Sequence, residues 1–161
     1  MKIRPAERRD LKRIEETMVA NTLFTEEEVR CAIELVEIFL DEDDPERNDY
    51  LTHVVEDSQG RVQGFVCFGP TPLTDRVYDL YWIAVEPATQ KKGFGQVLLR
   101  FVEDELRRLR GRMLLIETSS KTSYASTTRF YERSGYTEVS RIKDFYRADD
   151  DKIVYCKRLM P

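Results

Sequence analysis

Two glycines, Gly93 and Gly95, stand two residues apart where a polar stretch gives way to an apolar helical pattern, and Lys91 and Lys92 come directly before them. The start of a helix leaves backbone N–H groups without carbonyl partners, and these groups carry partial positive charge. A phosphate accepts hydrogen bonds from them readily, and glycines let the backbone approach it closely. The pair suggests either a phosphate-binding loop or a plain strand-to-helix turn, and alone it does not separate the two.

Other sequence patterns argue against several kinds of binding site. The stretch is neither the dinucleotide fingerprint G-x-G-x-x-G nor a P-loop, because no Gly-Lys-Ser/Thr appears. The three cysteines, Cys31, Cys67 and Cys156, are too widely spaced for a metal-ligand pattern or a disulfide framework. We therefore expect reduced thiols and no metal site.

The composition indicates one soluble domain that spans residues 1–161. Hydrophobic residues make up 41% and charged residues 35%, which is ordinary for a globular protein. The net charge of −4 argues against nucleic-acid binding, which usually needs a basic surface. No apolar run is long enough to span a membrane, and residues 1–10 lack a signal-peptide core. We expect a cytoplasmic protein with neither a membrane nor a nucleic-acid partner.

Hydrophobic periodicity predicts helices and strands along the whole chain. A first helix carries an apolar stripe, a second begins at a capping box formed by Thr25 and Glu28, a third follows the glycine pair, and a fourth ends before Gly135. Strands are expected at residues 1–4, 50–57, 61–69, 76–85, 112–118, 136–146 and 152–159. The order β-α-α-β-β-β-α-β-α-β-β predicts a mixed α/β fold, with a central twisted sheet flanked by helices on both faces.

This order closely resembles the GNAT superfamily of N-acetyltransferases. The family hallmark Arg/Gln-x-x-Gly-x-Gly/Ala, which holds the pyrophosphate of acetyl-CoA, is met in full by Gln90, Gly93 and Gly95. The sequence "FYERSGY" at 130–136 is similar to a second family signature on the fourth helix. The resemblance covers nearly the whole chain and implies that acetyl-CoA is the co-substrate.

The resemblance also implies where the cofactor binds. In this family the strand before the loop splays from its neighbour, and its backbone pairs with the pantetheine arm as if the cofactor were an extra strand. Family members often place an asparagine on the fourth helix, but this chain has Tyr124 there, so the contact is lost or passes to Ser126 or a nearby hydroxyl. The expected cofactor-binding residues are Ile83, Ala84, Val85, Gln90, Lys91, Lys92, Gly93, Phe94, Gly95, Gln96 and Ser126.

Acetyl transfer needs a base for the amine and an acid for the departing thiolate. By resemblance, Tyr131 is the general acid, because it occupies the family's F-Y-x-x-x-G-F/Y signature. Asp79 and Glu117 are candidate bases, since Asp79 lies where one branch of the family has a glutamate and Glu117 ends the strand near the expected cleft. Each carboxylate could equally be a surface or ion-paired group, and many family members use an ordered water chain instead.

The sequence thus predicts an acetyl-CoA-dependent N-acetyltransferase that acts by direct attack of a primary amine, carried by a small molecule or a peptide. The alternative is a non-catalytic acyl-CoA-binding sensor on the same fold. The oligomeric state is left open between a monomer and a homodimer. The acceptor amine has no signature in the chain.

Overall fold

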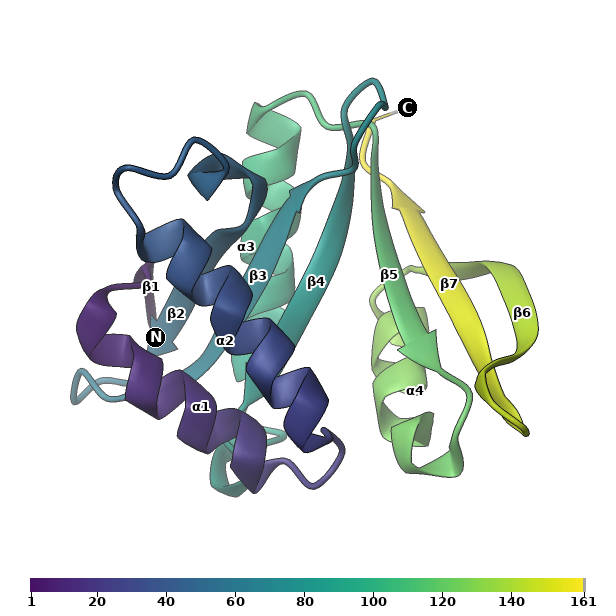
Figure 1. Ribbon diagram of the computed structural model, residues 1–161, viewed down its shortest axis with the longest axis horizontal. Coiled ribbons are helices and arrows are strands. Elements are labelled where there is room, and N and C mark those ends of the chain that lie inside the picture. The colour runs from purple at the N-terminus through teal and green to yellow at the C-terminus, as the bar shows by residue number, and fades with distance from the viewer. Residues whose placement is uncertain (161) are drawn as a thin grey trace. The chain divides into compact units, whose positions relative to one another are not determined.

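The computed structural model describes residues 1–160 and contains the expected succession of elements (Figure 1). The helices are α1 (Leu11–Ala20), α2 (Glu26–Leu40), α3 (Phe94–Arg108) and α4 (Ala125–Arg133). The strands are β1 (Lys2–Pro5), β2 (Leu51–Glu56), β3 (Val62–Pro70), β4 (Val77–Val85), β5 (Met113–Ser119), β6 (Thr137–Arg147) and β7 (Asp150–Arg158). The predicted mixed α/β class is confirmed.

The strands form one sheet in the order β1-β2-β3-β4-β5-β7-β6. The pair β4–β5 is parallel, and the pairs β1–β2, β2–β3, β5–β7 and β6–β7 are antiparallel. The chain divides into two compact units, which we describe separately. The first unit comprises Met1–Gly69 and Tyr81–Glu105, and the second comprises Pro70–Leu80 and the chain from Leu106 onward.

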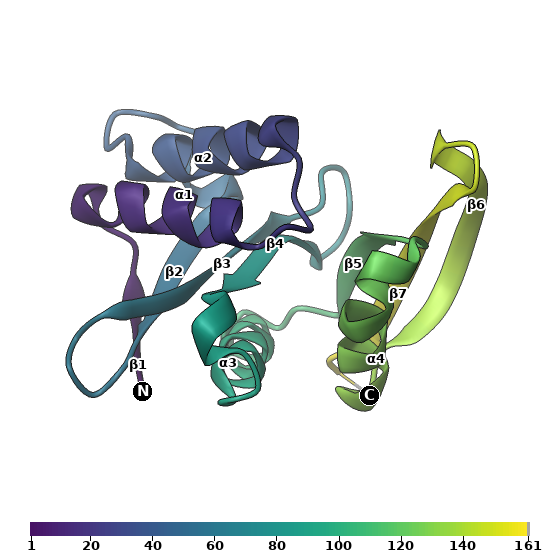
Figure 2. The same ribbon diagram turned by 90° about the horizontal axis from the view of Figure 1, so that it is seen from below.

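In the first unit, α1 and α2 cover one face of the strands and α3 covers the other (Figure 2). The apolar stripes that predicted these helices are buried, with Ile14 and Met18 on α1 and Val36 on α2 inside the core. The capping box at the start of α2 is confirmed, because the Glu28 amide donates to Thr25 Oγ1 at 3.2 Å and the Thr25 amide donates to Glu28 Oε2 at 2.7 Å.

Strand β3 approaches the end of β4 closely at a glycine. A Cβ atom at Gly64 would lie 2.6 Å from the Ala84 carbonyl oxygen and 3.2 Å from the Val85 Cα atom. A side chain at position 64 would therefore displace backbone rather than a flexible neighbour. Gly64 thus permits the close approach of β3 to the backbone at Ala84 and Val85.

In the second unit, α4 packs on one face of β5 and β7, and β6 forms the outer edge (Figures 1 and 2). The final hairpin is tighter than the sequence predicted, because backbone pairing continues through Arg147 and Asp150. The expected five-residue turn at 147–151 is reduced to residues 148 and 149, with Asp149 in the left-handed region at φ 62°. All eleven residues of β6 are exposed, so polar side chains can continue this strand without being buried.

Candidate active site

The glycine motif lies at an open helix start in the first unit. Helix α3 begins at Phe94, and Gly93 before it is exposed, with φ +89° and no atom within 4 Å of the position of a Cβ. Lys91 is also left-handed at φ 68°, and both Lys91 and Lys92 are exposed. The Phe94 side chain is buried, which leaves only its backbone for a ligand. A left-handed glycine with open space, a helix N-terminus and two exposed cations fit a diphosphate group.

The side chain of a buried asparagine is hydrogen-bonded to the first residue of the same motif. Asn21, at the C-terminal end of α1, is 7% exposed, and its Nδ2 group donates to the carbonyl oxygens of Thr17 at 2.7 Å and Val85 at 3.0 Å. Its Oδ1 atom accepts a hydrogen bond from Gln90 Nε2 at 2.9 Å. One side chain therefore joins the end of β4 to the first residue of the motif. The sequence did not reveal this role, because an asparagine after a helix is an ordinary C-terminal cap.

Two further contacts attach the α1–α2 region to the end of β4. Arg13 donates to Glu86 Oε2 at 2.7 Å, and the Phe24 ring meets the Trp82 ring edge-on at 5.9 Å between centroids. These contacts, like those of Asn21, lie within the first unit. They anchor the chain on both sides of Ile83–Val85, where the resemblance implies that the pantetheine arm binds.

The second unit displays its candidate catalytic groups on opposite faces of its strands. Residues paired directly across a ladder point to the same face, and successive residues alternate. Ile116 pairs with Tyr155, whose ring lies 6.0 Å from the ring of Tyr131 on α4, so this face is the one that α4 covers. Asp79 pairs with Leu115 and therefore points, together with Glu117, to the face away from α4.

Asp79 and Glu117 differ in their surroundings. Asp79 is half-buried and accepts a hydrogen bond from Thr71 Oγ1 at 2.6 Å. Burial raises the pKa of Asp79, the charge of Glu117 raises it further, and the Thr71 hydrogen bond and Lys152 act against this rise. Glu117 has a side chain that is 52% exposed and forms an ion pair with Lys152 at 2.9 Å. The proton affinity of Asp79 is thus shifted toward neutral pH.

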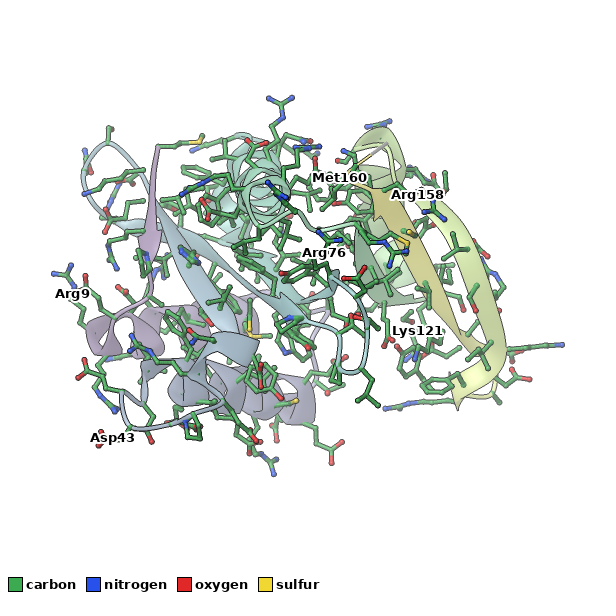
Figure 3. All side chains as sticks on the ribbon, turned by 90° about the horizontal axis from the view of Figure 1, so that it is seen from above. Arg9, Asp43, Arg76, Lys121, Arg158 and Met160 are labelled. Atoms are coloured by element: carbon green, nitrogen blue, oxygen red, sulfur yellow. The ribbon has the colours of Figure 1, made fainter. Side chains whose placement is uncertain are left out.

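Tyr131 is 4% exposed and is surrounded by the rings of Phe130, Tyr136 and Tyr155. Burial raises the pKa of its hydroxyl, so the phenol is protonated at neutral pH but donates its proton less readily than a free tyrosine does. Ser126, in the first turn of α4, is exposed. Lys121, labelled in Figure 3, lies just after β5 and forms an ion pair with Asp150 at 3.5 Å.

The histidine of the chain is structural. His53 packs in the first unit against Phe101, with 4.7 Å between ring centroids, and burial lowers its pKa to about 4. Among residues 1–160, no group of three or more histidine, cysteine or acidic side chains is arranged to hold a metal ion. Within the same described part of the chain, no helix has both the length and the apolar character needed to cross a membrane.

The hydrogen bond between Asn21 and Gln90 can be measured by a double-mutant cycle. We expect a coupling free energy of about 0.5–1.5 kcal/mol between Asn21→Ala and Gln90→Ala in urea unfolding, because each variant removes the same bond. The matched control is Gln63→Ala, since Gln63 bonds to Asp57 instead. Additive effects of Asn21→Ala and Gln90→Ala would refute the link.

The raised pKa of Asp79 predicts a pH-dependent effect on stability. A carboxyl whose pKa is higher in the folded state stabilises the fold only while protonated, and this contribution is lost as the pH rises through the folded pKa. Asp79→Asn should therefore increase the free energy of unfolding at neutral pH, and the gain should shrink as the pH falls toward the ordinary value of 3.8. Urea unfolding across a pH series measures it.

Asp75→Asn is the control for that series, because the hydrogen bond and charge of Arg76 lower the pKa of Asp75. This variant should show the opposite sign, a loss of stability at neutral pH that fades in acid. If Asp79→Asn instead loses stability at neutral pH, as Asp75→Asn should, burial does not raise the pKa of Asp79.

Comparisons with known proteins identify the family and the fold. A family model described as an acetyltransferase (GNAT) domain matches residues 48–138. A solved structure from Desulfovibrio desulfuricans, described as an acetyltransferase of the GNAT family, is 38% identical, with a TM-score of 0.91 and 99% of each chain covered. No curated protein sequence matched the chain.

More distant structures share the fold. A protein from Salmonella typhimurium, described as an acetyltransferase and solved with its cofactor acetyl-CoA, is 22% identical with a TM-score of 0.76, over 100% of this chain and 95% of that one. The ribosomal-protein-S18-alanine N-acetyltransferase of Escherichia coli is 20% identical with a TM-score of 0.75, over 99% and 94% of the two chains. Because the family model spans more than half of the sequence and the Desulfovibrio relative matches nearly all of it, the chain belongs to the GNAT family of acetyltransferases.

Proposed function

We propose that residues 1–161 act as a single acetyl-CoA-dependent N-acetyltransferase domain, whose acceptor is a primary amine of a small molecule or a peptide. The observation that carries the proposal is the complete Gln90-x-x-Gly93-x-Gly95 motif, with Gly93 left-handed and open at the start of α3. Membership of the GNAT family supports the reaction class. Acetyl-CoA supplies an activated acetyl thioester.

The backbone around Gly93 and Gly95 would hold the diphosphate, together with the amides of Phe94 and Gln96 and the charges of Lys91 and Lys92. Ile83, Ala84 and Val85 on β4 would pair with the pantetheine arm through their backbone. The Val85 carbonyl already accepts from Asn21, so the N–H groups of β4 are the better candidates for this pairing. Ser126 would contribute its exposed hydroxyl from α4.

Asp79 is the residue that we propose as proton acceptor for the incoming ammonium. A general base works best when its pKa is close to the working pH, and burial shifts the pKa of Asp79 in that direction. Glu117 lies on the same face and is held by Lys152. We assign it the attraction of a cationic acceptor rather than proton transfer.

Tyr131 is the residue that we propose as proton donor to the departing thiolate. It belongs to α4, and the two carboxylates point to the face away from that helix. Such an arrangement suits direct transfer, because the amine loses its proton on one side while the thiolate gains one on the other. A ping-pong route through a covalent acetyl-enzyme is not needed for these groups to act.

Gly93→Glu should abolish CoA binding, because it places a carboxylate where the diphosphate is expected. Isothermal titration calorimetry measures the affinity. The matched control is Gly60→Glu, since Gly60 in the β2–β3 turn has a similar φ of +75° and no atom within 4 Å of its Cβ position. Both variants introduce the same charge at a left-handed glycine with open space around its Cβ position. Equal CoA affinity in the two would contradict the motif's role.

Tyr131→Phe should lower kcat on the order of a hundredfold and leave CoA affinity nearly unchanged, as expected for the loss of a general acid. Release of free thiol in a screen of amines and peptides provides the assay. Phe130→Leu is a control for packing, because it alters the neighbouring ring and keeps the hydroxyl. Full turnover by Tyr131→Phe would show that Tyr131 is only a packing residue. If the wild type binds CoA but shows no turnover, the alternative function, a non-catalytic acyl-CoA-binding sensor, is favoured.

A further inference from the structure

A primary amine of the chain itself lies among the candidate catalytic carboxylates. The Nζ atom of Lys152 on β7 is 2.9 Å from Glu117 Oε1 and 4.7 Å from the centroid of the Phe145 ring. Its side chain is 19% exposed, compared with 52% for Glu117. The ammonium is therefore enclosed between a carboxylate and an aromatic face, which is how proteins recognise cations.

The sheet register places this amine on the reactive face. Lys152 pairs with Ser119, two residues beyond Glu117 on β5, so both side chains point away from α4. Asp79 points to the same face and senses the charges of both Glu117 and Lys152. Lys152 thus lies on the same face of the second unit as the two carboxylates to which the proposed mechanism assigns the acceptor amine.

We propose that Lys152 is a self-acetylation site, at which the chain transfers an acetyl group from acetyl-CoA to its own Nζ atom. The inference rests on the proposed function, because it uses the same acetyl donor and the same carboxylates. It adds a covalent modification of the protein that turnover of an external amine does not require.

The chemistry balances without another reactant. A carboxylate takes one proton from the ammonium, directly or through water, and the freed lone pair forms the N–C bond with the acetyl carbon. The C–S bond breaks, and its electron pair stays on the sulfur, which gains a proton as the thiol. The nitrogen loses a second proton as the amide forms, so the net products are acetyl-lysine, free CoA and one proton.

Acetylation would change the charges at the site. The modified Lys152 loses its positive charge, and with it the ion pair to Glu117 and the cation–π contact to Phe145. Glu117 then becomes an unpaired carboxylate on the same face as Asp79. The modified protein should attract a cationic acceptor more strongly, which would lower KM for such an amine more than it changes kcat.

The test is site-resolved peptide mass spectrometry of the full chain incubated with acetyl-CoA that carries an isotope-labelled acetyl group. Lys143 is the internal reference, because it is exposed on β6 and reports simple chemical acetylation. We expect Lys152 to be labelled faster than Lys143 by on the order of tenfold or more, since a positioned amine gains from proximity. The rate per molecule should not depend on protein concentration.

The Gly93→Glu variant, with Gly60→Glu as its control, separates the two proposals. In Gly93→Glu, but not in Gly60→Glu, the labelling rate of Lys152 should fall to that of Lys143. If CoA binds to the wild type and Lys152 is labelled no faster than Lys143, self-acetylation is refuted and the proposed function stands. If CoA does not bind at all, the proposed function fails and this inference fails with it. A rate that rises with protein concentration would refute transfer within one chain.

Discussion

Buried backbone groups need hydrogen-bond partners, and the end of β4 satisfies this need through one side chain. Asn21 donates to the Val85 carbonyl and accepts from Gln90, so a residue at the end of α1 fixes both the strand and the loop that follows it. Gly64 lets β3 approach the same backbone on the other side. The buried Asn21 side chain therefore ties the end of β4 to the first residue of the loop that leads to Gly93, and positioned amides favour the binding of an anion.

Charged groups of the second unit influence the proton affinity of the candidate base. Asp79 and Glu117 point to the same face, and the repulsion between them contributes to the raised pKa of Asp79. Lys152 offsets part of that repulsion from β7. The proton affinity of Asp79, the candidate base, thus depends on whether Lys152 on β7 keeps its charge.

The sequence predicted the order of elements because each carries a local signal, such as the capping box of Thr25 and Glu28. The predicted final turn was too long. The charged residues around Asp150 resemble a loop in the sequence, and their pairing as a strand depends on the partner strand. The sequence missed Asn21 and Lys152 for a related reason. Their contacts join residues that are distant in sequence, and no periodicity or spacing encodes such contacts. The roles of Asp79, Glu117 and Tyr131 stay predictions.

The exposure of β6 bears on how the protein behaves in concentrated solution. An outermost strand can act as a template onto which another chain adds its own strand. Between Ile142 and Arg147 the register shifts, and Asp144 adopts a left-handed φ of 53°, so the edge lacks a regular row of amides and carbonyls. Arg141 on this strand forms ion pairs with Glu138 and Asp151, which hold its side chain within the hairpin. The irregular backbone therefore makes this edge a poor template for a strand of a second chain.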